Sequence, residues 1–174
     1  MKIGILSDTH QKLKKAKASL EMLLDEGAEF IIHAGDIVEV EMLEMLKNSN
    51  TRYVAVFGNN DAHLLKYQNN YNLVKEPHYF KLCNTTFKLM HMPYYMTGDT
   101  EVVVFGHTHT FFAQMDGGSL FINPGEVCAR KKPISECAML EVESDEFVLT
   151  HYTRQKGAKK FSSATSFYKR DMLR

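Results

Sequence analysis

Short apolar runs alternate with amphipathic stretches over the first third of the chain. Residues 2–7, 29–36 and 52–61 are mostly apolar and have the length of buried strands. Between them, residues 11–26 and 38–48 repeat apolar side chains at helical spacing, which predicts two amphipathic helices. Strands that alternate with helices in this way favour a parallel sheet with right-handed crossovers.

The second half of the chain has a different pattern, in which short apolar or alternating segments follow one another with short breaks. The segments that we expect to be strands are 78–82, 85–91, 101–107, 110–116, 119–125, 137–143 and 146–152. The sequence MDGGS at 115–119 predicts a hairpin turn. Two packed sheets with helices outside would accommodate both halves.

Composition narrows the class of protein without naming a function. The chain has 174 residues, a length typical of one domain, with 44% hydrophobic and 24% charged residues. Its formal net charge of zero gives no argument for nucleic acid or for an acidic membrane surface, and no apolar stretch approaches the roughly 18 residues of a spanning helix. Cys83, Cys128 and Cys137 lack CxxC spacing, so we expect reduced packing residues in a cytoplasmic protein.

The last twenty residues form a compositionally distinct segment. Residues 155–174 hold six Lys or Arg and one Asp, which predicts a solvated or disordered basic tail after a domain spanning 1–154. One alternative is an arm that binds phosphate or a partner. Another is a docked terminal helix, whose apolar residues would be Phe161, Phe167, Tyr168 and Leu173.

Five predicted strands end in side chains that carry oxygen or imidazole groups. The endings are Asp8-Thr9-His10, Gly35-Asp36, Gly58-Asn59-Asn60-Asp61, His91 and Gly106-His107-Thr108-His109. Ligands of open α/β sheets gather at the carboxyl ends of strands, so these residues are expected to meet. The two-residue spacing of Asp8 and His10 points both side chains to one side, as does that of His107 and His109. Asn59 and Asn60 also fit ordinary turn chemistry.

These residue types predict a metal site with oxygen and nitrogen ligands. Manganese, iron, zinc, nickel and cobalt all accept such a set, and the lack of thiolates argues against a structural zinc cluster. The seven candidate ligands are Asp8, His10, Asp36, Asn59, His91, His107 and His109. Seven are too many for one ion and suit two, with Asp36 as the natural bridge. Two such ions can hold the oxygens of a phosphoryl group and activate a hydroxide for in-line attack.

The order of these blocks resembles the calcineurin-like metallophosphoesterase superfamily. Its motif runs D-x-H, G-D, G-N-H-[DE], a lone H and G-H-x-H, and the corresponding blocks here span residues 2 to about 127. The opening MKIGILSDTH, the GNND block and INPGE at 122–126 are most similar to its small single-domain bacterial and archaeal phosphodiesterases. The resemblance implies an α/β fold: a four-layer αββα sandwich of two mixed β-sheets flanked by helices.

The resemblance also implies how the ligands divide between two divalent metal ions. One ion would take Asp8, His10, Asp36 and His109, and the other would take Asp36, Asn59, His91 and His107. We expect manganese first, with nickel, iron, cobalt or zinc as alternatives.

Asn60 departs from the family motif. The motif has a histidine there that helps to protonate the leaving group, and an asparagine cannot act as a general acid at neutral pH. Its amide can still donate a hydrogen bond to a phosphoryl oxygen, so Asp36 and Asn60 are the expected catalytic residues. The expected substrate contacts are Asn59, Asn60, His63 and Arg130, with His63 as a substitute proton donor.

The interval between His91 and Gly106 is a second departure, because it is short where relatives often carry a helix, and this predicts a more open site. We therefore expect a metal-dependent phosphodiesterase that acts on a small phosphodiester. The alternatives are a phosphomonoesterase, a nucleotide pyrophosphatase or a non-catalytic scaffold, although a pure scaffold would be free to lose ligands. Membrane and nucleic-acid partners are not expected, whereas zero net charge does not oppose a homo-oligomer.

Overall fold

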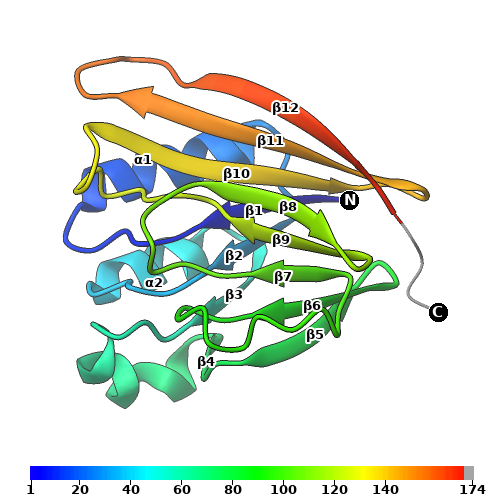
Figure 1. The fold of residues 1–174 in the computed structure, drawn as a ribbon. Helices are drawn as coiled ribbons and strands as arrows, with labels where there is room; N and C mark the ends of the chain where they lie inside the picture. The colour runs from blue at the N-terminus through cyan, green and yellow to red at the C-terminus, as the bar shows by residue number, and fades with distance from the viewer. Residues whose placement is uncertain (171–174) are drawn as a thin grey trace.

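Two mixed β-sheets packed face to face form the body of the molecule (Figure 1). The computed structural model describes residues 1–170. The seven-stranded sheet has the order β12 (Ser162–Lys169), β11 (Glu146–Gln155), β10 (Ile134–Val142), β1 (Lys2–Leu6), β2 (Phe30–His33), β3 (Arg52–Val56) and β4 (Leu73–Val74). The five-stranded sheet has the order β5 (His78–Leu82), β6 (Thr85–Leu89), β7 (Val102–Val104), β9 (Ser119–Asn123) and β8 (Phe112–Asp116).

Each sheet contains a parallel core, which gives its strands a common carboxyl end. β1, β2, β3 and β4 pair in parallel, as do β6, β7 and β9. The remaining pairings are antiparallel, including the predicted hairpin, in which Asp116 of β8 faces Ser119 of β9 across Gly117 and Gly118. Both glycines have positive φ, as a tight two-residue hairpin turn requires.

The helices cover the outer face of the seven-stranded sheet. α1 (Leu13–Asp25) and α2 (Val40–Asn48) confirm the two predicted helices, and a 3₁₀ helix, η1 (Ala62–Asn70), follows β3. Leu20 and Leu23 of α1 pack against the sheet in one buried cluster with Ile31 of β2. The apolar stripe of each helix is therefore what holds it on the sheet.

A second apolar cluster fills the space between the sheets. Ile3 and Ile5 of β1 and Ile32 of β2 meet Leu89 of β6 and Val104 of β7 there, all fully buried. The alternation of side chains along β1 explains this, because Gly4 faces Leu23 and Ile31 on the helix side instead. The predicted sandwich of two mixed sheets is thereby confirmed.

In the described part of the chain, a loop and not helices covers the outer face of the five-stranded sheet. Within residues 1–170 no helix follows Asn70, and the segment from Met92 to Glu101 covers this face. Lys88 of β6 anchors it: the fully buried ammonium group donates to the carbonyls of Tyr95 and Thr97. The short interval noted in the sequence returns to β7 as an irregular loop.

The basic C-terminal segment is partly a strand. β12 pairs with β11 in antiparallel register from Thr153–Ser162 to Glu146–Lys169. The expected disorder is therefore wrong for residues 162–169, as is the alternative of a docked helix. Pairing satisfies the backbone groups of β11 and lets Tyr168 pack against the core between the sheets. Leu173, the last residue of the expected helix, lies outside the described residues, and the division at residue 154 stays a prediction.

Membrane insertion finds no support in the helices of residues 1–170, none of which is both long and apolar enough to span a bilayer.

Candidate metal centre

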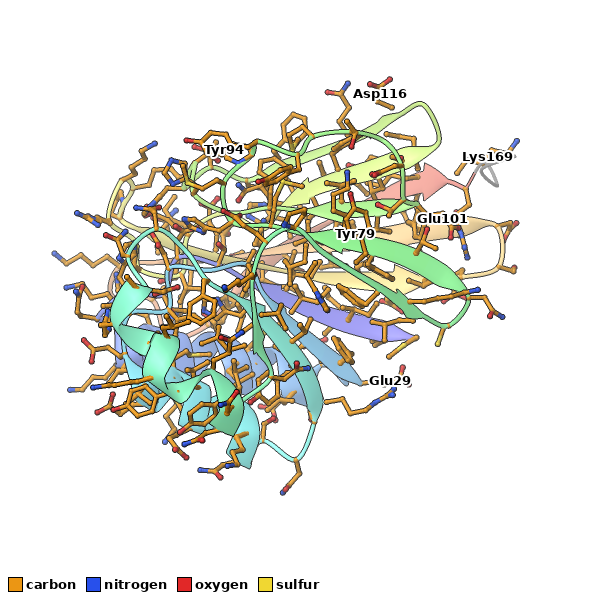
Figure 2. All side chains as sticks on the ribbon, turned by 90° about the horizontal axis from the view of Figure 1, so that it is seen from below. Glu29, Tyr79, Tyr94, Glu101, Asp116 and Lys169 are labelled. Carbon is orange, nitrogen blue, oxygen red and sulfur yellow. The ribbon has the colours of Figure 1, made fainter. Side chains whose placement is uncertain are left out.

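The carboxyl ends of five parallel strands converge on one edge of the sandwich. β1, β2 and β3 bring Asp8, His10, Asp36 and Asn59 to this edge, and β6 and β7 bring His91, His107 and His109. In Figure 1 the arrows of β6 and β7 point to this edge, on the left of the view. Glu29, Glu101 and Lys169 mark the opposite end of the sheets in Figure 2.

The backbone turns sharply where these side chains leave their strands. Asp8, His10, Asp36, His107 and His109 all have φ between 44° and 65°, in the left-handed region that non-glycine residues rarely adopt. Such strain persists only where neighbouring structure fixes it, and it clusters at functional sites. Here the N–H groups of Asp8 and His10 donate to the carbonyls of Gly35 and Asp36, which locks the loops after β1 and β2 together.

One group of four side chains offers ligand atoms that all lie within 4.8 Å of one another. It consists of Asp8, His10, Asp36 and His109. Nε2 of His109 lies 3.2 Å from Oδ1 of Asp8, and Nε2 of His10 lies 3.5 Å from Oδ2 of Asp36. Two carboxylates and two imidazoles in this arrangement match the donor set of a divalent transition-metal ion.

A second group adjoins the first and shares Asp36 with it. Oδ1 of Asn59 lies 3.0 Å from Nε2 of His91 and 3.0 Å from Nδ1 of His107. Nε2 of His91 also lies 3.5 Å from Oδ1 of Asp36. The structure therefore gathers all seven candidate ligands into two adjoining groups.

Asp36 stands between the groups with one oxygen toward each. Oδ2 faces His10 and Oδ1 faces His91. Asn60 fixes this orientation, because its backbone N–H donates to Oδ1 at 3.0 Å and its side-chain amide donates to Oδ2 at 2.8 Å. Burial acts to raise the pKa of Asp36, but His91 and the hydrogen bonds from Asn60 outweigh it and lower the pKa.

Only glycine fits at two positions around Asp36. A Cβ at Gly58 would overlap the backbone nitrogen and Oδ1 of Asp36, and a Cβ at Gly35 would come within 2.6 Å of the His91 ring. The close approach of these loops is what brings ligands from both sheets together.

Two buried polar atoms in the first group test whether a metal fits. Oδ1 of Asp8 and Nε2 of His10 make no hydrogen bond within the described part of the chain. Burial is the main cause that raises the pKa of Asp8, which means that its charge is poorly compensated by protein groups alone. Buried polar atoms are almost always paired, so a carboxylate oxygen and an imidazole nitrogen left open side by side fit a cation.

Glu126 is a member of the site that sequence reasoning missed. Its Oε2 lies 2.5 Å from Nδ1 of His109, and its Oε1 accepts the N–H groups of Lys131 and Lys132. Burial acts to raise the pKa of Glu126, but the hydrogen bonds from His109 and from backbone outweigh it and lower the pKa to about 2. Because the ionised Glu126 carboxylate accepts the proton-bearing Nδ1 of His109, the lone pair on Nε2 is left available to a metal ion, as in many histidine metal ligands.

Two further buried groups hold the loops behind the ligands. Nδ1 of His33 accepts the Gly35 N–H, so Nε2 carries the proton and donates to Thr9. Burial lowers the pKa of His33 to about 3, which keeps the ring neutral in this supporting position. Asp61 accepts the N–H groups of Ile37, Val38 and Gly58, which joins the loops after β2 and β3.

The expected substrate contacts are not all brought together. Asn60 and Arg130 line a cavity of about 450 Å³ beside His10, with Lys12 and Cys128. His63 is exposed instead, and its Nε2 lies 2.6 Å from the carbonyl oxygen of Val38. It does not line this cavity, so nothing in the structure places it beside a leaving group.

Cys128 lies closer to the ligands than sequence reasoning expected. Its buried thiol donates to Glu126 at 3.2 Å, and its Sγ can share an ion with His10 and His109. Burial is the main cause that raises the pKa of Cys128 to about 12. The thiol hydrogen is engaged by Glu126, so the geometry fits the expected packing role.

The sequence and the fold both match known proteins. A model of the calcineurin-like phosphoesterase superfamily domain matches residues 1–145. The phosphodiesterase MJ0936 of Methanocaldococcus jannaschii is 31% identical over 160 residues, which cover 84% of this chain and 96% of that protein.

Solved structures extend the likeness over nearly the whole chain. An archaeal phosphodiesterase superposes with a TM-score of 0.74 at 27% identity, covering 95% of this chain and 100% of its own. Vps29 of Chaetomium thermophilum gives a TM-score of 0.79 at 12% identity, covering 100% of this chain and 97% of its own. At that identity, the second match is a likeness of fold alone.

Proposed function

The chain belongs to the calcineurin-like phosphoesterase superfamily, and we propose that it is a phosphodiesterase that hydrolyses a small phosphodiester with two divalent metal ions. The observation that carries this proposal is Asp36, which presents one oxygen to each of two adjoining ligand groups. The 31% identity to the phosphodiesterase MJ0936 supports diester chemistry over the alternatives of a phosphomonoesterase and a nucleotide pyrophosphatase.

The proposed ligands are the members of the two groups. Asp8, His10 and His109 would hold one ion, Asn59, His91 and His107 would hold the other, and Asp36 would bridge them. Bound there, two ions would supply Lewis acidity toward the phosphoryl oxygens and a water of lowered pKa. The chain's own part is to fix the ligands: Glu126 orients His109, and the Ala34 carbonyl orients His91 through Nδ1 at 2.8 Å.

Asn60 and Arg130 are the proposed substrate contacts. One N–H of the Asn60 amide is engaged by Asp36, which leaves its second N–H to donate to a phosphoryl oxygen. Arg130 is exposed on the wall of the cavity beside His10, where a guanidinium group suits an anionic phosphoryl group. No imidazole stands at position 60 to protonate a leaving group, so esters of acidic alcohols are the favoured substrates.

Three finer proposals concern the ion, the compartment and the assembly. Manganese is the proposed ion, because the two groups combine carboxylate, amide and imidazole donors. A cytoplasmic location is supported by the three free cysteines. A homo-oligomer is supported by β12, which ends the seven-stranded sheet and has no further strand beside it among residues 1–170.

Hydrolysis of bis(4-nitrophenyl) phosphate and 4-nitrophenyl phosphate by chelator-stripped protein, with Mn²⁺, Ni²⁺, Co²⁺, Zn²⁺ or Mg²⁺ added back, tests the proposal. We expect metal-restored cleavage of the diester over the monoester, with a loss of at least about 100-fold in Asp36→Asn and His107→Ala. A folded protein that binds two ions and cleaves neither ester would favour the scaffold alternative. A preference for the monoester would overturn the proposed diester specificity and leave metal-dependent ester hydrolysis standing.

A further inference from the structure

An apolar cavity of about 310 Å³ opens beside the second ligand group. Asn59, whose Oδ1 lies between His91 and His107, is part of its wall. Phe57, Leu65 and Met92 are the large apolar residues of the remaining wall. The cavity therefore adjoins the second ligand group through Asn59, and it differs in character from the polar cavity beside His10.

The local structure explains why apolar side chains stand open here. Leu64 of η1 is fully buried and anchors that helix on the seven-stranded sheet, whereas its neighbour Leu65 is 54% exposed. Met92 comes directly after His91, so the loops after β3 and β6 bring the apolar wall and the ligands to the same spot. A single exposed leucine is common on a protein surface. A leucine that lines a cavity beside a ligand group, however, is well placed to contact a molecule that binds there.

The charged groups on the wall leave the cavity suited to an anionic ester with an apolar substituent. Glu76 is engaged, because its Oε2 accepts the N–H of His91 at 2.6 Å and that of Met92 at 2.9 Å. Lys75 is exposed at the wall and pairs with no carboxylate within residues 1–170. A free cation at the mouth attracts anions, while the apolar wall favours a ring over a hydrated group.

We propose that this cavity is a subsite for one ester group of the substrate, and that the group is planar and apolar, an aryl or heteroaromatic ring. The inference rests on the proposed function, because the phosphoryl group must lie at the adjoining ligand groups. The volume is at the lower end for small-molecule sites and suits one ring rather than a long chain. Phosphodiesters with an aromatic ester group would then be preferred over those with two small alkyl groups.

Binding of two phosphonates to the manganese-loaded full-length protein tests the subsite without a leaving group. We expect phenylphosphonate to bind about 10-fold more tightly than methylphosphonate by calorimetry, because only the phenyl ring reaches the apolar wall. Leu65→Ser and Met92→Ser should each remove most of this preference and leave methylphosphonate affinity as it was. Phe167→Ser is the matched control, since Phe167 is 66% exposed on β12 and lines none of these cavities.

The outcomes separate this inference from the proposed function. Equal affinity for the two phosphonates in the unaltered protein would overturn the subsite and leave the phosphodiesterase proposal standing. A preference for phenylphosphonate that survives both Leu65→Ser and Met92→Ser would also overturn it, because the ring would then bind elsewhere. Failure of both phosphonates to bind a protein loaded with two ions would contradict the phosphoryl site itself, and the subsite with it.

Discussion

Single residues around Asp36 explain how two loops become one site. Asn60 donates twice to Asp36, and the next residue, Asp61, joins the same loops by accepting three backbone N–H groups. These hydrogen bonds thus hold the backbone of the ligand residues at its strained φ values. The site is held in shape by the protein, which limits the reorganisation needed when ions bind.

Glu126 provides a residue-scale prediction. Glu126→Gln replaces one carboxylate oxygen by an amide group that cannot accept, while His109 and two backbone N–H groups all need an acceptor. We expect Mn²⁺ affinity at the first ligand group to fall by about 10–100-fold, measured by calorimetry. Glu41→Gln on the exposed face of α2 is the control and should leave affinity unchanged. Unchanged affinity in Glu126→Gln would show that His109 needs no such support.

Sequence could identify the seven candidate ligands because each lies in the segment that follows an apolar strand. It could not identify the role of Glu126, which depends on a contact with His109 across a hairpin. The INPGE stretch was the available signal, since a glutamate next to a turn beside a GHTH block is a candidate partner for an imidazole. His63 shows the reverse: its spacing suggested a site residue, but local geometry turns its ring to the Val38 carbonyl.

At the scale of elements, the alternation of apolar runs with amphipathic stretches predicted the parallel strands, α1 and α2. The composition of residues 155–174, in contrast, predicted disorder where β12 forms. The segment SSATSFYK is rich in small polar residues and has seven exposed positions, so its only strong reason to be a strand is the open edge of β11. That reason lies in the tertiary structure and is invisible in the segment itself. The short Met92–Glu101 loop predicted a more open site, and the structure shows that the loop packs on the five-stranded sheet through Lys88.

Adjacent aromatic residues on β12 give an element-scale prediction. Tyr168 packs against the core between the sheets, whereas Phe167 points to the opposite, exposed face. Tyr168→Ala should lower the free energy of unfolding by about 1–2 kcal/mol, less than a fully buried aromatic, because part of its surface stays in water. Phe167→Ala should change it by less than about 0.5 kcal/mol. Chemical denaturation measures both, and equal effects would mean that β12 is not docked as described.

At the scale of the whole molecule, the two sheets are needed together. The first ligand group draws Asp8, His10 and Asp36 from the seven-stranded sheet and His109 from the five-stranded one, and the second group is divided in the same way. The apolar cluster between the sheets therefore fixes their relative position and, with it, the distance between ligand groups. The alternating pattern of the first half and the all-β second half predicted this arrangement in outline.

We propose that this fold binds two metal ions next to each other, with Asp36 as the shared ligand. Calorimetric titration of chelator-stripped protein with Mn²⁺ measures how many ions bind, and Asp36→Asn is the variant that alters the shared ligand. We expect two ions bound per chain, and loss of at least one binding event in Asp36→Asn. One ion or none bound by the folded, unaltered protein would contradict a dinuclear centre.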